Sequence, residues 1–141
     1  MDRPPREAAA RDAEATNRPD ESHFKGTTGL RRLVNALEYS LHGLASAFRH
    51  EDAFRQEALL AAALIPIALV LGVGGVGKAM MIASVLLVLI VELLNSAIET
   101  AVDRISLDEH QLSKRAKDIG SAAVFLSLVN VVAVWALVLI G

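Results

Sequence analysis

The amino-acid sequence predicts an all-α membrane protein, with one amphipathic surface helix followed by three transmembrane helices. Three observations predict this class. Hydrophobic residues make up 53% of the 141-residue chain and aromatic residues only 4%, a composition typical of apolar helices packed in lipid. Two stretches of at least 20 residues carry no charge, which is long enough to cross a bilayer. A stretch with helical spacing of apolar residues precedes both of them.

Residues 1–26 are expected to be a disordered N-terminal extension. They mix both charge signs with Pro and Ala and hold almost no apolar side chain to bury, and such segments do not form a packed core. An apolar core of a signal peptide is also missing near the start. We therefore expect one membrane domain at residues 27–141, because a chain of this length has no room for a separate catalytic module.

An amphipathic helix is expected at about residues 28–48. Its apolar residues recur at spacings of three and four and share one face. They are Leu30, Leu33, Val34, Leu37, Leu41, Leu44, Ala45 and Phe48. Polar residues such as Arg31, Glu38 and His42 occupy the other face, so the helix should lie along a membrane surface. The alternative, packing on a soluble core, fails because the spans that follow offer no such core.

The three membrane spans are expected at about residues 57–77, 79–105 and 119–140. The uncharged stretches cover 20 and 23 residues, enough for a hydrocarbon core of ~30 Å at ~1.5 Å per residue. The middle helix is uncharged only over residues 79–91. It can cross the membrane only if the carboxylates that follow lie toward the far surface or inside a bundle.

The basic residues predict the orientation. Of the 14 Lys and Arg residues, nine precede Ala58 and four lie between Arg104 and Lys117, which is the same side of the membrane in a three-span chain. Only Lys78 falls on the other side. By the positive-inside rule the amino terminus is cytoplasmic and the carboxyl terminus external.

Four polar residues in VELLNSAIETAVD (residues 91–103) share one helix face. Glu92, Asn95, Glu99 and Asp103 fall within roughly 80° at ~100° per residue. A carboxylate near lipid needs a partner, a cation or a wet cleft. This pattern predicts a functional site, with a structural polar seam between helices as the alternative.

Further polar groups lie on the same side of the membrane, in HEDAFRQE before the first span and in DEHQLSKRAKD before the third. Carboxylates from two elements suit Mg²⁺, which prefers oxygen ligands and substrate phosphates. Lys114, Arg115 and Lys117 suit phosphate oxygens, or else belong to a solvated loop that obeys the positive-inside rule. The chain has no Cys and its His residues show no paired metal spacing, so no zinc site is expected. The net charge of -2 does not indicate nucleic acid.

The stretch GVGGVGKA, residues 72–79, approaches the phosphate-loop pattern without fulfilling it. Ala79 stands where that motif has the Ser or Thr that holds Mg²⁺. The stretch also follows a membrane helix rather than a strand, on the expected external side. It predicts a Gly-rich turn between two helices.

ELLNSAIETAVDRI followed by KRAKDIGSAAV, with AFRQE after the amphipathic helix, resembles the signature of the small prokaryotic integral-membrane diacylglycerol kinases. The resemblance covers Thr28 to about Gly141. It implies a homotrimer in the cytoplasmic membrane, with active sites between neighbouring subunits at the cytoplasmic interface. It also implies transfer of the γ-phosphoryl of MgATP to the free hydroxyl of a membrane lipid, diacylglycerol, giving phosphatidic acid.

Residue roles follow from the same resemblance. The general base falls on Glu92 with Asn95 beside it, the Mg²⁺ ligands on Glu51 and Glu99, and a supporting role on Asp103. The implied ATP-binding residues are Tyr39, Glu51, Glu99, Asp108, His110, Lys117 and Asp118. The implied lipid-binding or supporting residues are Arg32, Arg55, Gln56, Glu57, Glu92 and Ser121. The loop ISLDEHQLSK departs from the family's commonest pattern around Ser106, Leu107 and Lys114.

Two other functions remain open at this point. A polyprenol kinase of the same superfamily would use similar chemistry on another long-chain alcohol, although AFRQE favours diacylglycerol. In a small ion- or proton-conducting oligomer, the polar face of residues 92–103 would line the conduction path. This function leaves the pair Lys117–Asp118 unexplained. A purely structural membrane protein would not need carboxylates on several elements at one depth.

Overall fold

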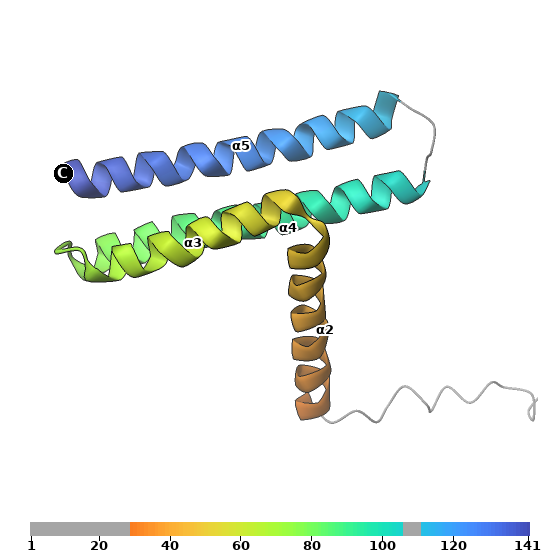
Figure 1. The fold of residues 1–141 in the computed structure, drawn as a ribbon, viewed down its shortest axis with the longest axis horizontal. Coiled ribbons are helices and arrows are strands. Elements are labelled where there is room, and N and C mark those ends of the chain that lie inside the picture. The colour runs from red at the N-terminus through yellow and green to blue at the C-terminus, as the bar shows by residue number, and fades with distance from the viewer. Residues whose placement is uncertain (1–28, 106–110) are drawn as a thin grey trace, which may run out of the picture. The chain divides into compact units, whose positions relative to one another are not determined.

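The computed structural model describes residues 29–105 and 111–141, which form four helices (Figure 1). They are α2 (Gly29–His50), α3 (Asp52–Val70), α4 (Gly75–Ile105) and α5 (Gln111–Ile140). The chain divides between Ser40 and Leu41 into two units, and α2 runs across this division. The prediction of an all-α membrane protein is confirmed. The expected disorder of residues 1–26 lies outside the described residues.

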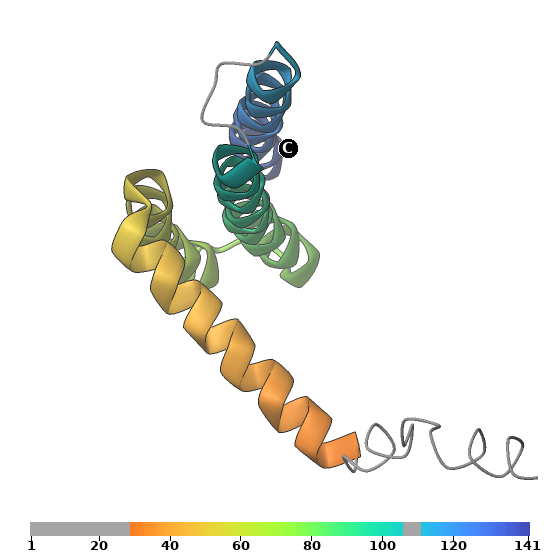
Figure 2. The same cartoon turned by 90° about the vertical axis from the view of Figure 1, so that its right-hand side faces the viewer.

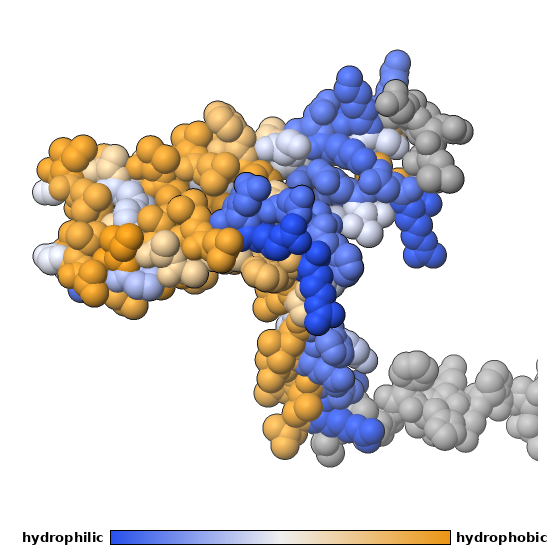
Figure 3. Space-filling model, in the orientation of Figure 1, coloured by the Kyte–Doolittle hydropathy of each residue, from blue (hydrophilic) through white to orange (hydrophobic). Residues whose placement is uncertain are grey.

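Helix α2 has the two faces that the spacing predicts. Its large apolar side chains are all at least 44% exposed, and none of its residues is buried. These side chains lie along one side of the helix, and the hydrophilic ones lie along the other (Figure 3). An apolar stripe of this kind is stable against a lipid surface or another apolar surface.

Helices α3, α4 and α5 are each long and apolar enough to cross a membrane. The candidate spans in α4 and α5 have 30 residues each, or about 45 Å at ~1.5 Å per residue, which exceeds the ~30 Å of hydrocarbon. Their ends therefore reach beyond the hydrocarbon. Hydrophilic side chains gather where α4 ends and α5 begins, whereas the end at the α3–α4 turn is mostly hydrophobic (Figure 3).

Helix α4 is the central element, because it packs against both α3 and α5 (Figure 2). The buried residues of α3 are Phe54, Ala61 and Ala68, seven residues apart, so one narrow stripe of α3 faces α4. Most large side chains of α5 are exposed, including Phe125 at 65%. Helices α3 and α5 thus bury little of their apolar surface, and the remainder is suited to lipid or to another membrane helix.

The Gly-rich stretch only partly forms the turn between α3 and α4, because α4 already begins at Gly75. The lysine of the stretch contacts the end of α3. Lys78 Nζ donates a hydrogen bond to the carbonyl oxygen of Leu69 at 2.6 Å. The last carbonyls of a helix lack intrahelical donors and carry partial negative charge. Lys78 therefore caps α3 from the first turn of α4.

Replacing Lys78 by Met should destabilise the fold without affecting the chemistry of the polar end. Met keeps the length of the side chain but removes the donor, so the expected loss is about 1 kcal/mol. The measurement is the thermal unfolding midpoint in detergent micelles, with Lys78→Arg as a control that retains a cationic donor. An unchanged midpoint in Lys78→Met would show that the hydrogen bond does not stabilise the turn.

Candidate functional site

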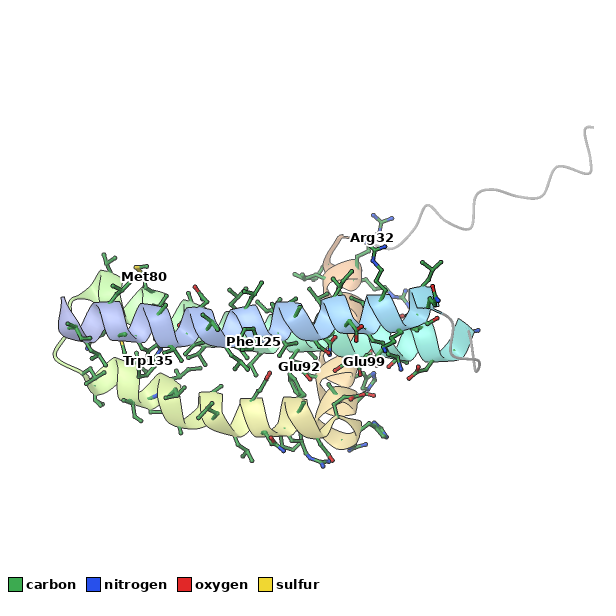
Figure 4. The ribbon with its side chains drawn as sticks, turned by 90° about the horizontal axis from the view of Figure 1, so that it is seen from above. Arg32, Met80, Glu92, Glu99, Phe125 and Trp135 are labelled. Atoms are coloured by element: carbon green, nitrogen blue, oxygen red, sulfur yellow. The ribbon has the colours of Figure 1, made fainter. Side chains whose placement is uncertain are left out.

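Most buried polar side chains of α4 lie in the half of the helix toward the hydrophilic end of the bundle, with Ser84 as the exception. Glu92 is 4% exposed and Asn95 8% exposed. Glu92 and Glu99 lie in the half of α4 away from the α3–α4 turn, whereas Met80, and Trp135 of α5, lie near the turn (Figure 4). A carboxylate with almost no access to solvent is costly unless other polar groups surround it.

Asn95 and Glu99 are linked by a hydrogen bond along α4. Asn95 Nδ2 donates to Glu99 Oε1 at 3.1 Å, one helical turn further on. This bond sets the orientation of the amide, so that Oδ1 is directed toward Gly120 of α5. Oδ1 is buried and has no hydrogen-bond partner among the described residues.

Glu51 lies at the junction of α2 and α3. It is the N-cap residue of α3, with extended backbone angles, and its side chain makes no capping hydrogen bond. Arg55 joins the two helices around it, since Arg55 donates to the carbonyl oxygen of Arg49 at 3.2 Å and pairs with Asp52. The junction therefore holds Glu51 by its backbone and leaves its carboxylate available.

Carboxylates from three elements act on one another electrostatically. Glu92 experiences the negative charges of Glu99, on its own helix, and of Glu51 at the α2–α3 junction. Glu57 of α3 interacts in the same way with Glu92, and its buried Oε2 has no hydrogen-bond partner in the described part of the chain. Like charges in a partly buried place favour a cation or a proton among them.

A lysine of α5 lies beside this group of carboxylates. Lys117 Nζ and Asp103 Oδ1 are 2.5 Å apart and join the last turn of α4 to α5. Lys117 also experiences the charge of Glu99. Because its side chain is 39% exposed, Lys117 can meet a ligand from solvent while it stays paired with Asp103.

The structure thus brings six of the predicted site residues into one electrostatic group. They are Glu51, Glu57, Glu92, Asn95, Glu99 and Lys117, with Asp103 paired to Lys117. Gln56, Asp118 and Ser121 are exposed side chains of α3 and α5. Arg32 and Tyr39 lie on α2 before the division of the chain. The predicted ATP contacts Asp108 and His110 lie outside the described residues.

Gly120 is the residue of this region that the sequence analysis missed. It is buried on α5 against Asn95, where a Cβ atom would lie within 3.0 Å of Oδ1. The signal was present in the run GSAA, residues 120–123, since small residues allow membrane helices to approach closely. The run alone does not indicate which helix it faces.

Comparison with known proteins agrees with the sequence resemblance. A family model described as prokaryotic diacylglycerol kinase matches residues 38–139. A diacylglycerol kinase of Pseudomonas aeruginosa is 58% identical over 120 residues, covering 85% of this chain and 98% of that protein. One of Haemophilus influenzae is 56% identical over 109 residues, or 77% and 92% of the two chains. One of Escherichia coli is 47% identical over 113 residues, or 80% and 93%.

Proposed function

Because the chain belongs to the prokaryotic diacylglycerol kinase family, we propose that it transfers the γ-phosphoryl group of ATP to the free hydroxyl of diacylglycerol. The products are phosphatidic acid and ADP. The observation that carries this proposal is the group of carboxylates around the buried Glu92, with Lys117 beside it. Phosphoryl transfer mainly requires positioned charges and a base that accepts the hydroxyl proton.

Glu92 is the proposed base. It is buried in the half of α4 away from the α3–α4 turn, where the hydroxyl of a lipid held at membrane depth would reach it. As the hydroxyl oxygen bonds to the γ-phosphorus, the bond from that phosphorus to the β–γ bridging oxygen breaks. Glu92 takes the hydroxyl proton, and the bridging oxygen leaves with ADP.

Glu51 and Glu99 are the proposed Mg²⁺ ligands. Among the described residues no group of three or more potential ligands is arranged to hold a metal by itself. The donor set nevertheless fits Mg²⁺, which is usually bound by one or two carboxylates together with phosphate oxygens. Bound in this way, Mg²⁺ would neutralise charge on the phosphates. Asn95 holds Glu99 in place through its hydrogen bond.

Lys117 is the proposed phosphate contact, since it is a cation beside Glu99. The other proposed ATP contacts are Tyr39, Asp108, His110 and Asp118, and the proposed lipid contacts are Arg32, Arg55, Gln56, Glu57 and Ser121. All of these roles rest on the family resemblance. For Arg55 the junction of α2 and α3 supports a different contribution, because this side chain is engaged with Asp52 and Arg49.

The proposed setting is the cytoplasmic membrane of a prokaryote, with the amino terminus cytoplasmic, the carboxyl terminus external and the chain assembled as a homotrimer. The basic residues support the orientation, since 13 of 14 Lys and Arg would lie on the cytoplasmic side. The exposed apolar surface of α5 is compatible with packing against another subunit as well as against lipid.

The experiment is transfer of labelled γ-phosphate from MgATP by the purified protein in lipid-containing micelles, with diacylglycerol and undecaprenol offered in parallel. We expect label in phosphatidic acid. Label only in the polyprenol would keep the mechanism and replace the acceptor. If folded protein labels neither lipid, the proposed kinase activity is overturned. Ion flux in liposomes without ATP would then point to conduction.

A further inference from the structure

We propose that Gly120 of α5 is a positioning residue for the reaction, because the side-chain amide of Asn95 packs directly against it and is held in its orientation by this contact. The inference rests on the proposed function, since it concerns how the carboxylate of Glu99 is held. Gly120 itself has no side chain that could touch a substrate, so it can act only through its neighbours.

The contact leaves no room for a side chain at position 120. A Cβ atom there would lie within 3.0 Å of Asn95 Oδ1 and 3.3 Å from Asn95 Cγ. Asn95 is not the mobile end of a flexible side chain, because it is 8% exposed and bonded to Glu99. Any residue larger than glycine must therefore displace the amide or push α5 away from α4.

Displacing the amide would disturb the proposed Mg²⁺ ligand. The amide donates to Glu99 Oε1 through Nδ2, so a rotation that moves Oδ1 away from Gly120 also moves Nδ2 away from Glu99. Glu99 would lose the bond that orients its carboxylate, whose charge acts on Glu92.

Displacing α5 would disturb the proposed phosphate contact instead. Lys117 precedes Gly120 by three residues and so lies on the same face of α5. The close approach at Gly120 brings this face to α4, where Lys117 meets Asp103. Either displacement therefore changes the relative positions of the polar side chains of the site. We expect this change to lower the rate of the chemical step.

The chain contains a matched control at the other end of the same helix pair. Gly77 of α4 faces α5, and a Cβ atom there would lie 3.0 Å from Val138 Cγ1. Gly77→Ala also crowds the contact between α4 and α5, less tightly than Gly120→Ala does, and it does so against a methyl group next to the α3–α4 turn. A role of Gly120 in packing alone would lower the thermal midpoint of both variants and leave kcat unchanged in both.

The test compares Gly120→Ala, Gly77→Ala, Asn95→Ala and the double variant Gly120→Ala/Asn95→Ala. Measured for each are kcat, the KM values for diacylglycerol and MgATP, and the thermal midpoint in micelles. We expect Gly120→Ala to lower kcat about 10- to 100-fold, as small misplacements do, with the KM for diacylglycerol nearly unchanged. Gly77→Ala should lower the midpoint and keep kcat.

In the Asn95→Ala background the amide oxygen is absent, so adding Gly120→Ala should lower neither kcat nor the thermal midpoint any further. If Gly120→Ala does not fold, the double variant should recover folding. A normal kcat in Gly120→Ala, an equal loss in Gly77→Ala, or independent losses in the double variant would each overturn the inference. An inactive wild-type protein would instead overturn the proposed function.

Discussion

Glu92→Gln is expected to reduce phosphoryl transfer by about 10²- to 10⁴-fold, the usual contribution of a general base. Gln has nearly the shape of Glu and fits a position that is 4% exposed, so the variant should fold and insert in the membrane. The neutral amide cannot accept the hydroxyl proton. The measurement is the initial rate of labelled phosphatidic acid formation at saturating MgATP and diacylglycerol.

Two controls separate the loss of the base from a loss of structure. The thermal midpoint of Glu92→Gln should equal or exceed that of the wild type, because one buried negative charge near Glu99 and Glu51 is removed. Glu38→Gln, at an exposed position of α2, makes the same chemical change at a residue with no proposed role and should keep full activity. An active Glu92→Gln would remove Glu92 from the role of base and leave the rest of the site in question.

The second large effect is expected for Glu99→Gln. A glutamine oxygen can still accept the hydrogen bond from Asn95 Nδ2, so the geometry of the pair is kept while the negative charge is lost. If Glu99 binds Mg²⁺, activity at a fixed Mg²⁺ concentration should fall at least about 10-fold, and half-maximal activity should require more Mg²⁺. The measurement is the rate as a function of free Mg²⁺ at constant ATP.

The two variants should differ in their response to the metal. Glu92→Gln should stay slow at every Mg²⁺ concentration, whereas Glu99→Gln should recover part of its rate as Mg²⁺ rises. A Glu99→Gln variant with a normal rate and a normal Mg²⁺ dependence would exclude Glu99 as a ligand. Recovery of Glu92→Gln by Mg²⁺ would mean that the two roles are assigned to the wrong residues.

The polar face of α4 shows how much of the site could be predicted from the sequence. The spacing of Glu92, Asn95 and Glu99 depends only on the period of a helix, so their common face was predictable from the sequence alone. The hydrogen bond between Asn95 and Glu99 joins neighbouring turns of that one helix. A contact of this kind is local, and local contacts are what a periodic pattern encodes.

Contacts between helices were not predictable in the same way. The resemblance assigned Arg55 a lipid-binding role, but it gave no sign that this side chain also engages Arg49 and Asp52 at the α2–α3 junction. Lys78 served only as an indicator of orientation, yet it bonds the last turn of α3. Long, flexible cationic side chains can reach many partners, and which one they reach depends on how the helices pack.

The sequence by itself determined the class of the protein, the succession of one amphipathic and three apolar helices, and the face of α4 that carries the carboxylates, because apolar length and helical period are properties of single segments. Only the tertiary structure decided which residues of other helices meet that face. It brought Glu51 and Glu57 within electrostatic reach of Glu92, Lys117 to Asp103, and Gly120 to Asn95. The rotation and depth of one helix against another are set by close packing of many side chains at once, which no single segment specifies.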